Sequence, residues 1–432
     1  MDSKLWSRLP EDEQVMVLSF LPWFEILRLR VVCVKWNQIL RSSEFRQNWR
    51  GRESSQTPLC FMGSKDYGTR IYNPALQKWQ DCGRSFVTFR MDEGVYKAPD
   101  ARVMGSARGL LLLQILLGPG YAAATPHSLM QDLFVVNPLD PLNKKRVRLL
   151  PHLQHPNTSS VLGMAWNDIT RSHQILFQHH PEGLIFNDIS SQESNMWTFY
   201  SYDVENDAWD RVARWPKDRY RDFQSPSIAG GNFQCLAKMC SSSLPYGSTP
   251  PSVQRFRYYL RDKSGKNWLN EPTWVELEDH GAPSLPYPLH FAILFHQDHE
   301  TFVAGGEVSF SLVDNSDEYI GLQGFTVWKL HEERSEESEC EENQWLEIHR
   351  MPSEIVDTFR KGVNMQFYCA ANEKFLIVAN WWRDCAVLDM NNMSWRVLPP
   401  EPHNLSAESP IREELFDLFY LHLCEPRLDI LL

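Results

Sequence analysis

The sequence lacks the patterns that mark secreted, membrane-spanning and metal-scaffold proteins. Its 432 residues include nine cysteines, but there is no CxxC pair and no regular cysteine spacing, so no disulfide framework is indicated. The longest apolar run, residues 110–117, contains Gln114 and is far too short to span a bilayer. Residues 1–6 have no apolar signal core. We therefore expect an intracellular protein, in the cytoplasm and/or nucleus, with no membrane contact.

Positive charge is scarce in most of the chain. The formal net charge is −12, and residues 1–52 hold nine Lys/Arg against six Asp/Glu, so the remainder carries −15. This balance disfavours nonspecific binding to nucleic acid or to anionic membrane, and we expect no direct nucleic-acid partner. Residues 332–342 form an acidic run. The simplest interpretation of that run is a solvated loop, and a docking site for a basic partner is the alternative.

The chain has no recognisable catalytic motif. It contains no GxSxG elbow, no P-loop and no GxGxxG after a strand. His290, His296 and His299 have i, i+6, i+9 spacing, which fits neither a helical HExxH nor a paired-cysteine finger. We interpret these three as surface histidines on a loop. We accordingly expect no catalytic residue, no metal site and no cofactor.

The first fifty residues predict three short amphipathic helices. Leu9-Pro10 before three acidic residues is a helix start, and Pro22 ends the first apolar run. The apolar positions of the three helices are Val17, Leu18 and Leu21; Phe24, Ile26, Leu27 and Leu29; and Val32, Trp36, Ile39 and Leu40. Helices this short bury little surface alone, so they need a partner helix or a neighbouring domain.

This segment resembles an F-box, whose pattern begins Leu-Pro, continues with an apolar helix ending in Leu, and closes with Val…Trp. In that family the three helices pack against a Skp-type adaptor, which a cullin scaffold holds in turn. The resemblance implies adaptor-binding roles for Leu9, Pro10, Val17, Leu18, Leu21, Ile26, Leu27, Val32 and Trp36. Glu13 and Gln14 stand where the family usually has apolar residues, which lowers the expected strength of the first helix's contact.

After residue 52, short β-rich runs alternate with turn clusters, as in an all-β architecture. One repeat recurs: Asn or Asp at a strand end, Trp six residues later, and an apolar residue three positions beyond. The Trp positions of its six copies, some with longer turns, are Trp79, Val147, Trp209, Trp274, Trp345 and Trp395. A β-hairpin whose second strand buries its Trp against the first explains the repeat, so we assign this Trp series to the core.

Five of the six copies follow a further strand pair, so each unit offers about four strands. These pairs lie at residues 106–114, 161–177, 227–237, 291–303 and 366–379. Gly230-Gly231 and Gly305-Gly306 are doubled glycines of the kind found where backbones pass closely. Residues 60–79 lack a preceding pair, and residues 415–423 with 427–432 form a pair with no hairpin after it. Joining them makes six blades and leaves no open sheet edge; seven blades are the alternative.

The whole chain therefore resembles the plant-type F-box/kelch-repeat proteins. The resemblance implies a mainly β fold: a three-helix F-box at residues 1–50, then a six-bladed kelch-like β-propeller at residues 53–432, closed by strands in 415–432. It further implies a non-catalytic substrate-recognition subunit of an SCF-type (Skp–cullin–F-box) E3 ubiquitin ligase, whose propeller binds a target protein. A non-proteolytic co-regulator or scaffold is the alternative, and a propeller enzyme is a third reading without a catalytic motif to support it.

Two aromatic and basic groups are candidates for the target-binding face. Exposed Trp, Tyr and Arg are favoured anchors of protein interfaces. The first group is a loop after the third repeat, with Trp215, Tyr220 and Arg221, and the second is a strand end with Trp381, Trp382 and Arg383.

Overall fold

The computed structural model covers the whole chain and describes its helices, most of its strands and their tight turns. The described residues are 6, 8–21, 25–26, 29, 32–50, 59–64, 68–73, 77–81, 88–91, 94–97, 101–116, 131–137, 147–150, 159–179, 196–216, 220–229, 232–239, 256–261, 274–276, 289, 291–297, 300–313, 317–333, 342–359, 367–380, 384–399 and 420–424.

The N-terminal part is helical, as expected. Helix α2 (Glu11–Ser19) follows Pro10 and has three acidic residues in its first turn, which confirms the predicted helix start. Residues 25, 26 and 29 are helical, within the expected second helix. Helix α4 (Val34–Arg41) begins after Cys33, whose Sγ accepts a hydrogen bond from the Trp36 amide at 3.4 Å. Among the described residues, no helix has the length and apolar character needed to cross a membrane.

A further helix, α5 (Ser43–Arg50), was not among the three predicted, and it supplies much of the helical core. Phe45 and Trp49 on this helix are 0% exposed. The indole Nε1 of Trp49 donates a hydrogen bond to the Leu21 carbonyl at 3.3 Å, which ties α5 to the end of the first helical segment. Helices α2 and α5 pack directly on each other. The small helical unit therefore completes more of its own core than three helices could.

The strands form six four-stranded antiparallel sheets and one two-stranded sheet among the described residues. In order from the first to the last strand, the first two sheets are β26 (Tyr420–Cys424), β1 (Leu59–Ser64), β2 (Gly68–Asn73), β3 (Lys78–Asp81); and β6 (Ala101–Ala107), β7 (Leu110–Leu116), β8 (Gln131–Val136), β9 (Val147–Leu149). The third and fourth sheets are β10 (Ser159–Asn167), β11 (Ser172–His179), β12 (Met196–Asp203), β13 (Ala208–Pro216); and β14 (Tyr220–Ala229), β15 (Asn232–Met239), β16 (Phe256–Arg261), β17 (Trp274–Glu276). The fifth and sixth sheets are β18 (Phe291–Gln297), β19 (Glu300–Val313), β20 (Asp317–Glu333), β21 (Glu342–Arg350); and β22 (Phe367–Ala371), β23 (Phe375–Asn380), β24 (Cys385–Asp389), β25 (Ser394–Val397).

The predicted Trp hairpins are confirmed, and each one forms the last two strands of a sheet. Each predicted Trp position lies directly opposite a residue of the preceding strand. The cross-strand pairs are Tyr72↔Trp79, Val136↔Val147, Tyr202↔Trp209, Arg261↔Trp274, Leu330↔Trp345 and Leu388↔Trp395. The five predicted upstream pairs form the first two strands of the other sheets. The repeat thus marks sheet boundaries correctly.

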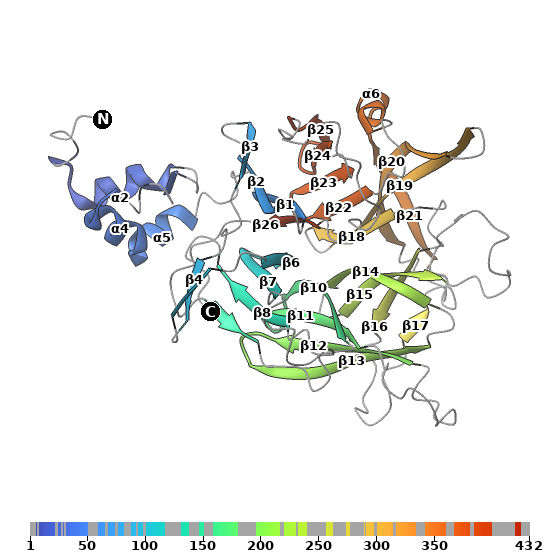
Figure 1. Cartoon of the computed structure of the whole chain (residues 1–432), viewed down its shortest axis with the longest axis horizontal. Helices are drawn as coiled ribbons and strands as arrows, with labels where there is room; N and C mark the ends of the chain where they lie inside the picture. Colours follow the sequence, from blue (N-terminus) through green and yellow to red (C-terminus); the bar gives the residue numbers. More distant parts are fainter. Residues whose placement is uncertain are drawn as a thin grey trace.

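The first strands of the sheets lie side by side in a closed ring. Strand β26 contacts β6, and the contacts continue through β10, β14, β18 and β22, which contacts β26 again. In Figure 1 these six strands lie around the middle of the strand region, with later strands of each sheet farther out and helices α2, α4 and α5 to one side. Sheets arranged radially about a central axis in this way are a β-propeller.

Among the described residues, one C-terminal strand closes the ring where a pair was expected. Strand β26 pairs antiparallel with β1, from Leu59↔Cys424 to Gly63↔Tyr420. The stretch read as one hairpin at residues 60–79 holds three strands, because β1 turns back into β2 before the Trp strand β3. One further strand completes the four, so the closure is three plus one instead of two plus two. Residues 427–432 lie outside the described residues.

The apolar core lies between neighbouring sheets. One large cluster joins Phe302 and Phe325 of the β18–β21 sheet to Leu376 and Leu388 of the next sheet. Gly305 confirms the close backbone approach expected of the doubled glycine, because a Cβ there would lie 2.8 Å from the Phe291 carbonyl oxygen. A Cβ at Gly306 would lie 2.3 Å from the Phe291 ring. Gly230-Gly231 lies outside the described residues.

The assignment of the Trp series to the core holds in part. Trp79 is buried and donates from Nε1 to the Pro399 carbonyl at 3.0 Å. Trp209, Trp345 and Trp395, which like Trp79 lie in the fourth strands of their sheets, are only partly buried.

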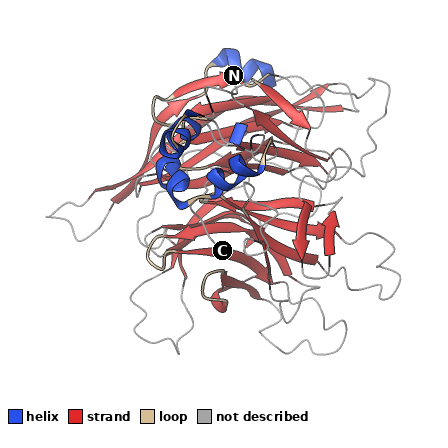
Figure 2. Cartoon of the chain, turned by 90° about the vertical axis from the view of Figure 1, so that its left-hand side faces the viewer, coloured by secondary structure: helices blue, strands red, loops and turns tan. Residues whose placement is uncertain are grey.

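Two small elements were not predicted. A two-stranded hairpin of β4 (Thr88–Met91) and β5 (Gly94–Lys97) lies between the first two sheets in the chain. Helix α6 (Ser353–Val356) and the 3-10 turn η6 (Asp357–Phe359) follow β21 and bury Val356 and Phe359 in the core cluster. Figure 2 shows α2, α4 and α5 grouped in front of the strands, with α6 apart from them.

We predict that β26 is required for a stable ring and that the residues after it are not. A chain ending at residue 419 loses Leu421 and Leu423, each 6% exposed, and burial of two such side chains contributes about 3–6 kcal/mol. It also leaves the β1 edge unpaired, which favours aggregation. A chain ending at residue 424 keeps all four strands and is the matched control. Thermal melting and solubility should separate the two. An equal loss of Tm and solubility in both truncations would support the two-strand closure. No loss in either truncation would exclude closure by the C-terminus.

We also predict that acid weakens this closure through His422. Burial lowers the pKa of His422 to about 4 from 6.5, against a smaller opposing effect of a hydrogen bond with the Val103 backbone. A folded-state pKa below the unfolded one means that the unfolded chain binds more protons between these values, so stability falls as the pH drops from 6.5 towards 4, by roughly 3 kcal/mol in all. His422→Gln should flatten the dependence of Tm on pH in that window. His331→Gln, at an exposed position of β20, is the control and should not. The same slope in wild type and His422→Gln would contradict the assignment.

Candidate functional site

Large apolar side chains are exposed on the helical unit. Helix α2 exposes Met16 (52%) and Val17 (43%), and Phe20 directly after it is 67% exposed. Near the start of α4, Val32 is 61% exposed and Val34 is 74% exposed. Of the exposed large apolar residues in the described part of the chain, most belong to this small unit. Exposed apolar groups gathered on one small domain are typical of an interaction surface.

The structure separates the predicted adaptor-binding residues by burial. Leu18 and Ile26 are buried in the helical core, whereas Leu9, Leu21 and Trp36 are partly buried. Pro10, Val17 and Val32 are exposed, and Leu27 lies outside the described residues. Met16, Phe20 and Val34 were missed by the sequence reasoning. The i, i+4 spacing of Met16 and Phe20 on one helical face was the available signal.

Gln14, expected to weaken the contact of the first helix, has a different role. Its side chain is 1% exposed and points into the helical unit. The amide Nε2 donates to the Leu9 carbonyl at 2.6 Å and to the Trp6 carbonyl at 3.4 Å. Gln14 therefore holds the segment before α2 against the helix, while Glu13 is exposed to solvent.

On the propeller, charged side chains meet where the first strands of several sheets turn into the second. Arg108 lies in the β6–β7 turn, and its Nη2 is 3.0 Å from Asp168 Oδ1 in the β10–β11 turn and 3.8 Å from Glu373 Oε1 in the β22–β23 turn. Its guanidinium carbon lies 4.8 Å from the centre of the Trp166 ring. Since β26 lies between β6 and β22 in the ring, the approach of Arg108 to Glu373 joins two sheets that are not neighbours.

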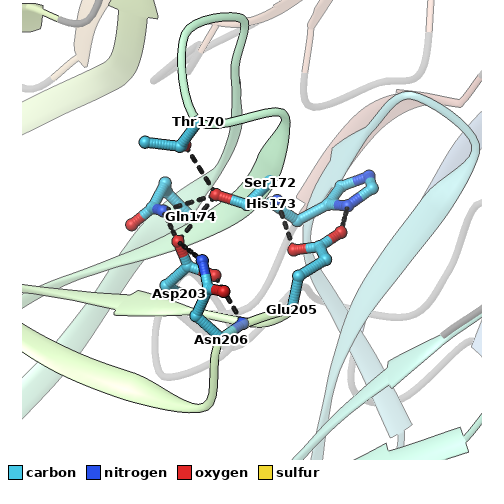
Figure 3. Close-up of polar contacts among 7 residues, drawn as sticks. All are labelled: Thr170, Ser172, His173, Gln174, Asp203, Glu205 and Asn206. Atoms are coloured by element: carbon cyan, nitrogen blue, oxygen red, sulfur yellow. Dashed lines mark hydrogen bonds and ion pairs between the residues drawn. The ribbon is translucent and has the colours of Figure 1, made fainter.

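A buried polar network supports this end of the β10–β13 sheet. Ser172 Oγ and Gln174 Nε2 each donate to Asp203 Oδ2 at 2.7 Å, and the Asn206 amide donates to Oδ1 at 2.8 Å. Figure 3 shows these groups around the Asp203 carboxylate. Partial burial alone raises the pKa of Asp203, but the hydrogen bonds from Ser172, Asn206 and Gln174 outweigh it, so this pKa lies below its usual value. The carboxylate is a fixed acceptor that orders the two turns.

Next to this network, His173 is held by Glu205. The His173 amide donates to Glu205 Oε2 at 2.7 Å, and Nδ1 lies 2.6 Å from Oε1 (Figure 3). The His173 ring is 1% exposed and makes an edge contact with Trp166, at 4.7 Å between centroids. Glu205 thus fixes the His173 ring, and the His173 ring packs against Trp166. The Trp166 ring in turn lies against the Arg108 guanidinium.

The interpretation of the three histidines as a surface loop is wrong for His296. This residue lies in strand β18, where burial lowers its pKa to about 4 against smaller opposing effects of the Glu300 backbone and the charge of Asp168. Its Nδ1 is 3.2 Å from Thr301 Oγ1 across the β18–β19 hairpin. His296 is partly buried within the strand pair that was predicted at residues 291–303. His290 and His299 lie outside the described residues. Among those described, no group of three or more His, Cys, Asp or Glu could hold a metal ion.

The first predicted target-binding group, Trp215, Tyr220 and Arg221, lies at the other end of the sheets. Trp215 is near the end of β13, and Tyr220 and Arg221 begin β14. These residues therefore flank the connection from the fourth strand of one sheet to the first strand of the next, and not a turn between first and second strands. They lie in strands and not in the expected loop. Trp381, Trp382 and Arg383 lie outside the described residues, between Asn380 and Asp384. The acidic run begins in β20 and ends in β21, with residues 334–341 outside the described residues.

Comparison with known proteins identifies the helical unit. A model of the F-box domain matches residues 6–48. An F-box/kelch-repeat protein of Arabidopsis thaliana is 39% identical over 75 residues, 17% of this chain and 18% of that protein. F-box only protein 6 of the same plant is 32% identical over 82 residues, 18% of this chain and 17% of that protein. The chain therefore aligns with less than a fifth of the length of these curated relatives.

Solved structures give only weak likenesses. The β-propeller domain of the trilobed protease from Pyrococcus furiosus has a TM-score of 0.30 at 9% identity, over 69% of this chain and 71% of that one. The Cps50 (Swd1) β-propeller domain of Myceliophteria thermophila has a TM-score of 0.32 at 9% identity, over 70% and 90%. These likenesses carry no argument about the fold, which rests on the strand pairing. The helical unit therefore matches the F-box domain, and a β-propeller follows it in the chain.

Proposed function

We propose that this chain is the substrate-recognition subunit of an SCF-type E3 ubiquitin ligase. The F-box match at residues 6–48 is the observation that carries the proposal, because F-box domains generally bind Skp-type adaptors. In this proposal the adaptor links the chain to a cullin, and the propeller presents a protein target for ubiquitin transfer. The chain itself performs no chemistry and contributes proximity and orientation.

We propose the following division of the chain. Residues 1–50 are the F-box, and residues 53–432 are a kelch-like β-propeller whose six four-stranded sheets are its blades, closed by strands within 415–432. The six sheets, the ring of first strands and the β26–β1 pairing support this division. The name of the Arabidopsis relative supports the kelch assignment.

The adaptor contact is proposed to use the exposed apolar residues of the helical unit. Pro10, Val17 and Val32 would contact the adaptor directly, together with Met16, Phe20 and Val34. Leu18 and Ile26 would act from the core by holding the helices in place, with Leu9, Leu21, Leu27 and Trp36 contributing from the edges of the packed helices. Their exposures support this separation.

Val17→Glu combined with Phe20→Glu is expected to weaken adaptor binding. Each substitution puts a charge on an exposed apolar contact, and loss of such anchors costs about 1–3 kcal/mol each, or roughly tenfold or more in affinity. The measurement is binding to a purified Skp-type adaptor by calorimetry or pull-down. Ile169→Glu, at a 65% exposed position of the propeller, is the matched control and should bind as wild type. An unchanged affinity in the double variant with an unchanged Tm would exclude this surface.

A non-proteolytic co-regulator or scaffold is the alternative function, and target turnover separates the two. Proteins captured with the chain from native cells under proteasome block should include a target that accumulates there. That target should have a longer half-life in cells expressing the Val17→Glu/Phe20→Glu variant. A captured target whose ubiquitination and half-life do not change with adaptor binding would favour the scaffold.

A further inference from the structure

The hairpin of β19 and β20 is longer than the sheet to which it belongs. Strand β19 has 14 residues and β20 has 17, whereas β18 has 7 and β21 has 9. Strand β18 pairs with β19 only as far as Gly306, and β21 pairs with β20 only as far as Thr326. Beyond these points, among the described residues, β19 and β20 pair only with each other. We call this extension, residues 307–313 and 317–325, the arm, and Figure 1 shows it projecting past the rest of its sheet.

The outer edge of β19 is open along the arm. Among the described residues, no strand pairs with β19 on that side between Ser309 and Val313. The edge of β20 is partly covered at its base, because the Met351 amide donates to the Phe325 carbonyl at 2.9 Å and helix α6 packs on β20. Residues 307–325 contain neither Pro nor Lys, which commonly block an exposed edge. The row of backbone donors and acceptors on β19 can therefore pair with an added strand.

One face of the arm is apolar. In β19, Val308, Phe310 and Leu312 alternate with serines, and alternate residues of a strand share a face. Phe310 lies opposite Ile320, and Val308 lies opposite Leu322, so β20 adds two apolar residues to that face. Val308 is 8% exposed and Leu322 is 0% exposed. The apolar face thus begins in the core and continues along the arm, where an added strand would extend it.

The arm carries charge of one sign. Residues 307–325 contain four Asp/Glu and no Lys or Arg, and the longer stretch 267–328 contains ten Asp/Glu and no Lys or Arg. Residues 347–361, which span the end of β21, α6 and η6, contain three acidic and three basic residues and add no net charge. Arg214 and Arg221, which lie towards the same end of the ring, belong to the third and fourth sheets. The negative charge of the arm is therefore not balanced by its own sheet.

This charge decides which strand the edge can accept. Two copies of the chain that paired through their arms would bring four negative charges of each copy together, and like charges across a strand pair are destabilising. Pairing between copies is therefore disfavoured, although the edge is open. A strand with Lys or Arg would instead meet charges of the opposite sign.

The arm projects from the end of the ring opposite to the entry of the chain. Strand β1 starts at Leu59, which lies opposite Cys424 at the end of β26, so the chain enters the propeller where first strands turn into second strands. The arm connects a second strand to a third and therefore points the other way. A partner on the arm is held away from the connection to the helical unit.

We propose that the arm binds an extended, basic segment of the target protein, which adds as a strand to the outer edge of β19. Its lysine or arginine residues are attracted by the acidic residues of the arm, and its alternate apolar residues extend the face of Val308, Phe310 and Leu312. This inference rests on the proposed function, because it takes the propeller to be the part that holds the target. It adds the element that holds the target and the chemistry of the segment held.

The test uses the full-length chain, free and bound to a Skp-type adaptor, with labelled ten-residue peptides as probes. Fluorescence anisotropy compares a peptide of alternating lysine and valine with one of alternating glutamate and valine. A third peptide has the lysine–valine sequence with every backbone amide N-methylated. The unmodified lysine–valine peptide should bind at least about tenfold more tightly than either, because only it has both the positive charge and the amide donors. Equal or tighter binding of either other peptide would overturn the proposal.

Hydrogen exchange locates the added strand. With saturating lysine–valine peptide, the amides of Ser309–Val313 should exchange more slowly, and those of Phe375–Asn380 in β23 should not change. Slower exchange at another sheet edge, with the arm unchanged, would contradict the proposal.

Asp317→Asn combined with Glu318→Gln should weaken binding of the lysine–valine peptide about threefold or more and reduce its dependence on salt. The matched control is Asp210→Asn with Glu373→Gln, which removes the same formal charge at exposed positions of β13 and of the β22–β23 turn. The control should change the affinity by less than about twofold. Equal losses in both variants would mean that overall charge, and not the arm, attracts the peptide, and would overturn the proposal.

Ser311→Pro and Leu312→Pro test the edge itself. Neighbouring residues of an edge strand direct their amides alternately to the partner strand and to the open side. One of the two substitutions therefore removes an outward donor and keeps the β19–β20 hydrogen bonds. The variant with the higher Tm should bind the peptide about tenfold more weakly than wild type. Wild-type affinity in that variant would exclude strand addition at β19.

Two further readouts separate this inference from the proposed function. Adaptor binding should be unchanged in every arm variant, and a chain that binds adaptor but not the lysine–valine peptide would refute the arm alone. A chain that binds the peptide but not the adaptor would refute the ligase proposal alone. Sedimentation velocity should show no self-association through the arm. A dimer of wild type that Leu312→Pro abolishes would mean that a second copy occupies the edge, and would overturn the assignment of a basic target segment.

Discussion

The antiparallel pairing of β26 with β1 is the contact on which the propeller depends. It joins Tyr420–Cys424 to Leu59–Ser64 and completes the only described sheet whose strands come from both ends of the propeller. Neighbouring contacts strengthen it: Ser106 Oγ on β6 donates to the Leu423 carbonyl, and Trp79 donates to Pro399 at the end of the preceding sheet. Without β26, both β6 and β22 would lose a neighbour in the ring. The position of every turn around the axis, and so the contact of Arg108 with Asp168 and Glu373, follows from this closure.

The two parts of the chain use burial in opposite ways. Each sheet of the propeller buries its apolar residues against the next, so the ring has little large apolar surface left among its described residues. The helical unit keeps several apolar side chains in water, although α5 gives it a core of its own through Phe45 and Trp49. An exposed apolar surface is costly unless a partner covers it. This difference fits the proposal that the helical unit contacts a partner through its exposed apolar side chains.

Much of the fold could be predicted from the sequence because its signals are local. The Asn/Asp-to-Trp spacing reflects a hairpin in which the Trp lies opposite the strand end, and Tyr72, Tyr202 and Leu388 mark this register directly. Helix α5 was missed because Phe45 and Trp49 are two apolar residues among charged ones, too few for a clear stripe. The predicted closure was only partly right, because residues 60–79 were taken as one two-stranded hairpin and the reversal between β1 and β2 was not recognised in the sequence. The contact of Arg108 with Asp168 and Glu373 could not be predicted at all, because these residues are far apart in the chain and no local pattern shows that their turns meet.

The three-plus-one closure also sets the order of events when the chain is made. Ribosomes deliver β1 before the strands of the five other sheets and β26 after them, so one edge of β1 stays unpaired while those sheets are made. Contacts between such distant segments are slow to make, because the ends of a long loop have to find each other. During that wait the β1 edge and its apolar neighbours are open to pairing with other chains. Chaperone occupancy should therefore persist until β26 leaves the ribosome, and a delay in translation just before β26 would lower the yield of correctly folded protein more than the same delay between two of the other sheets.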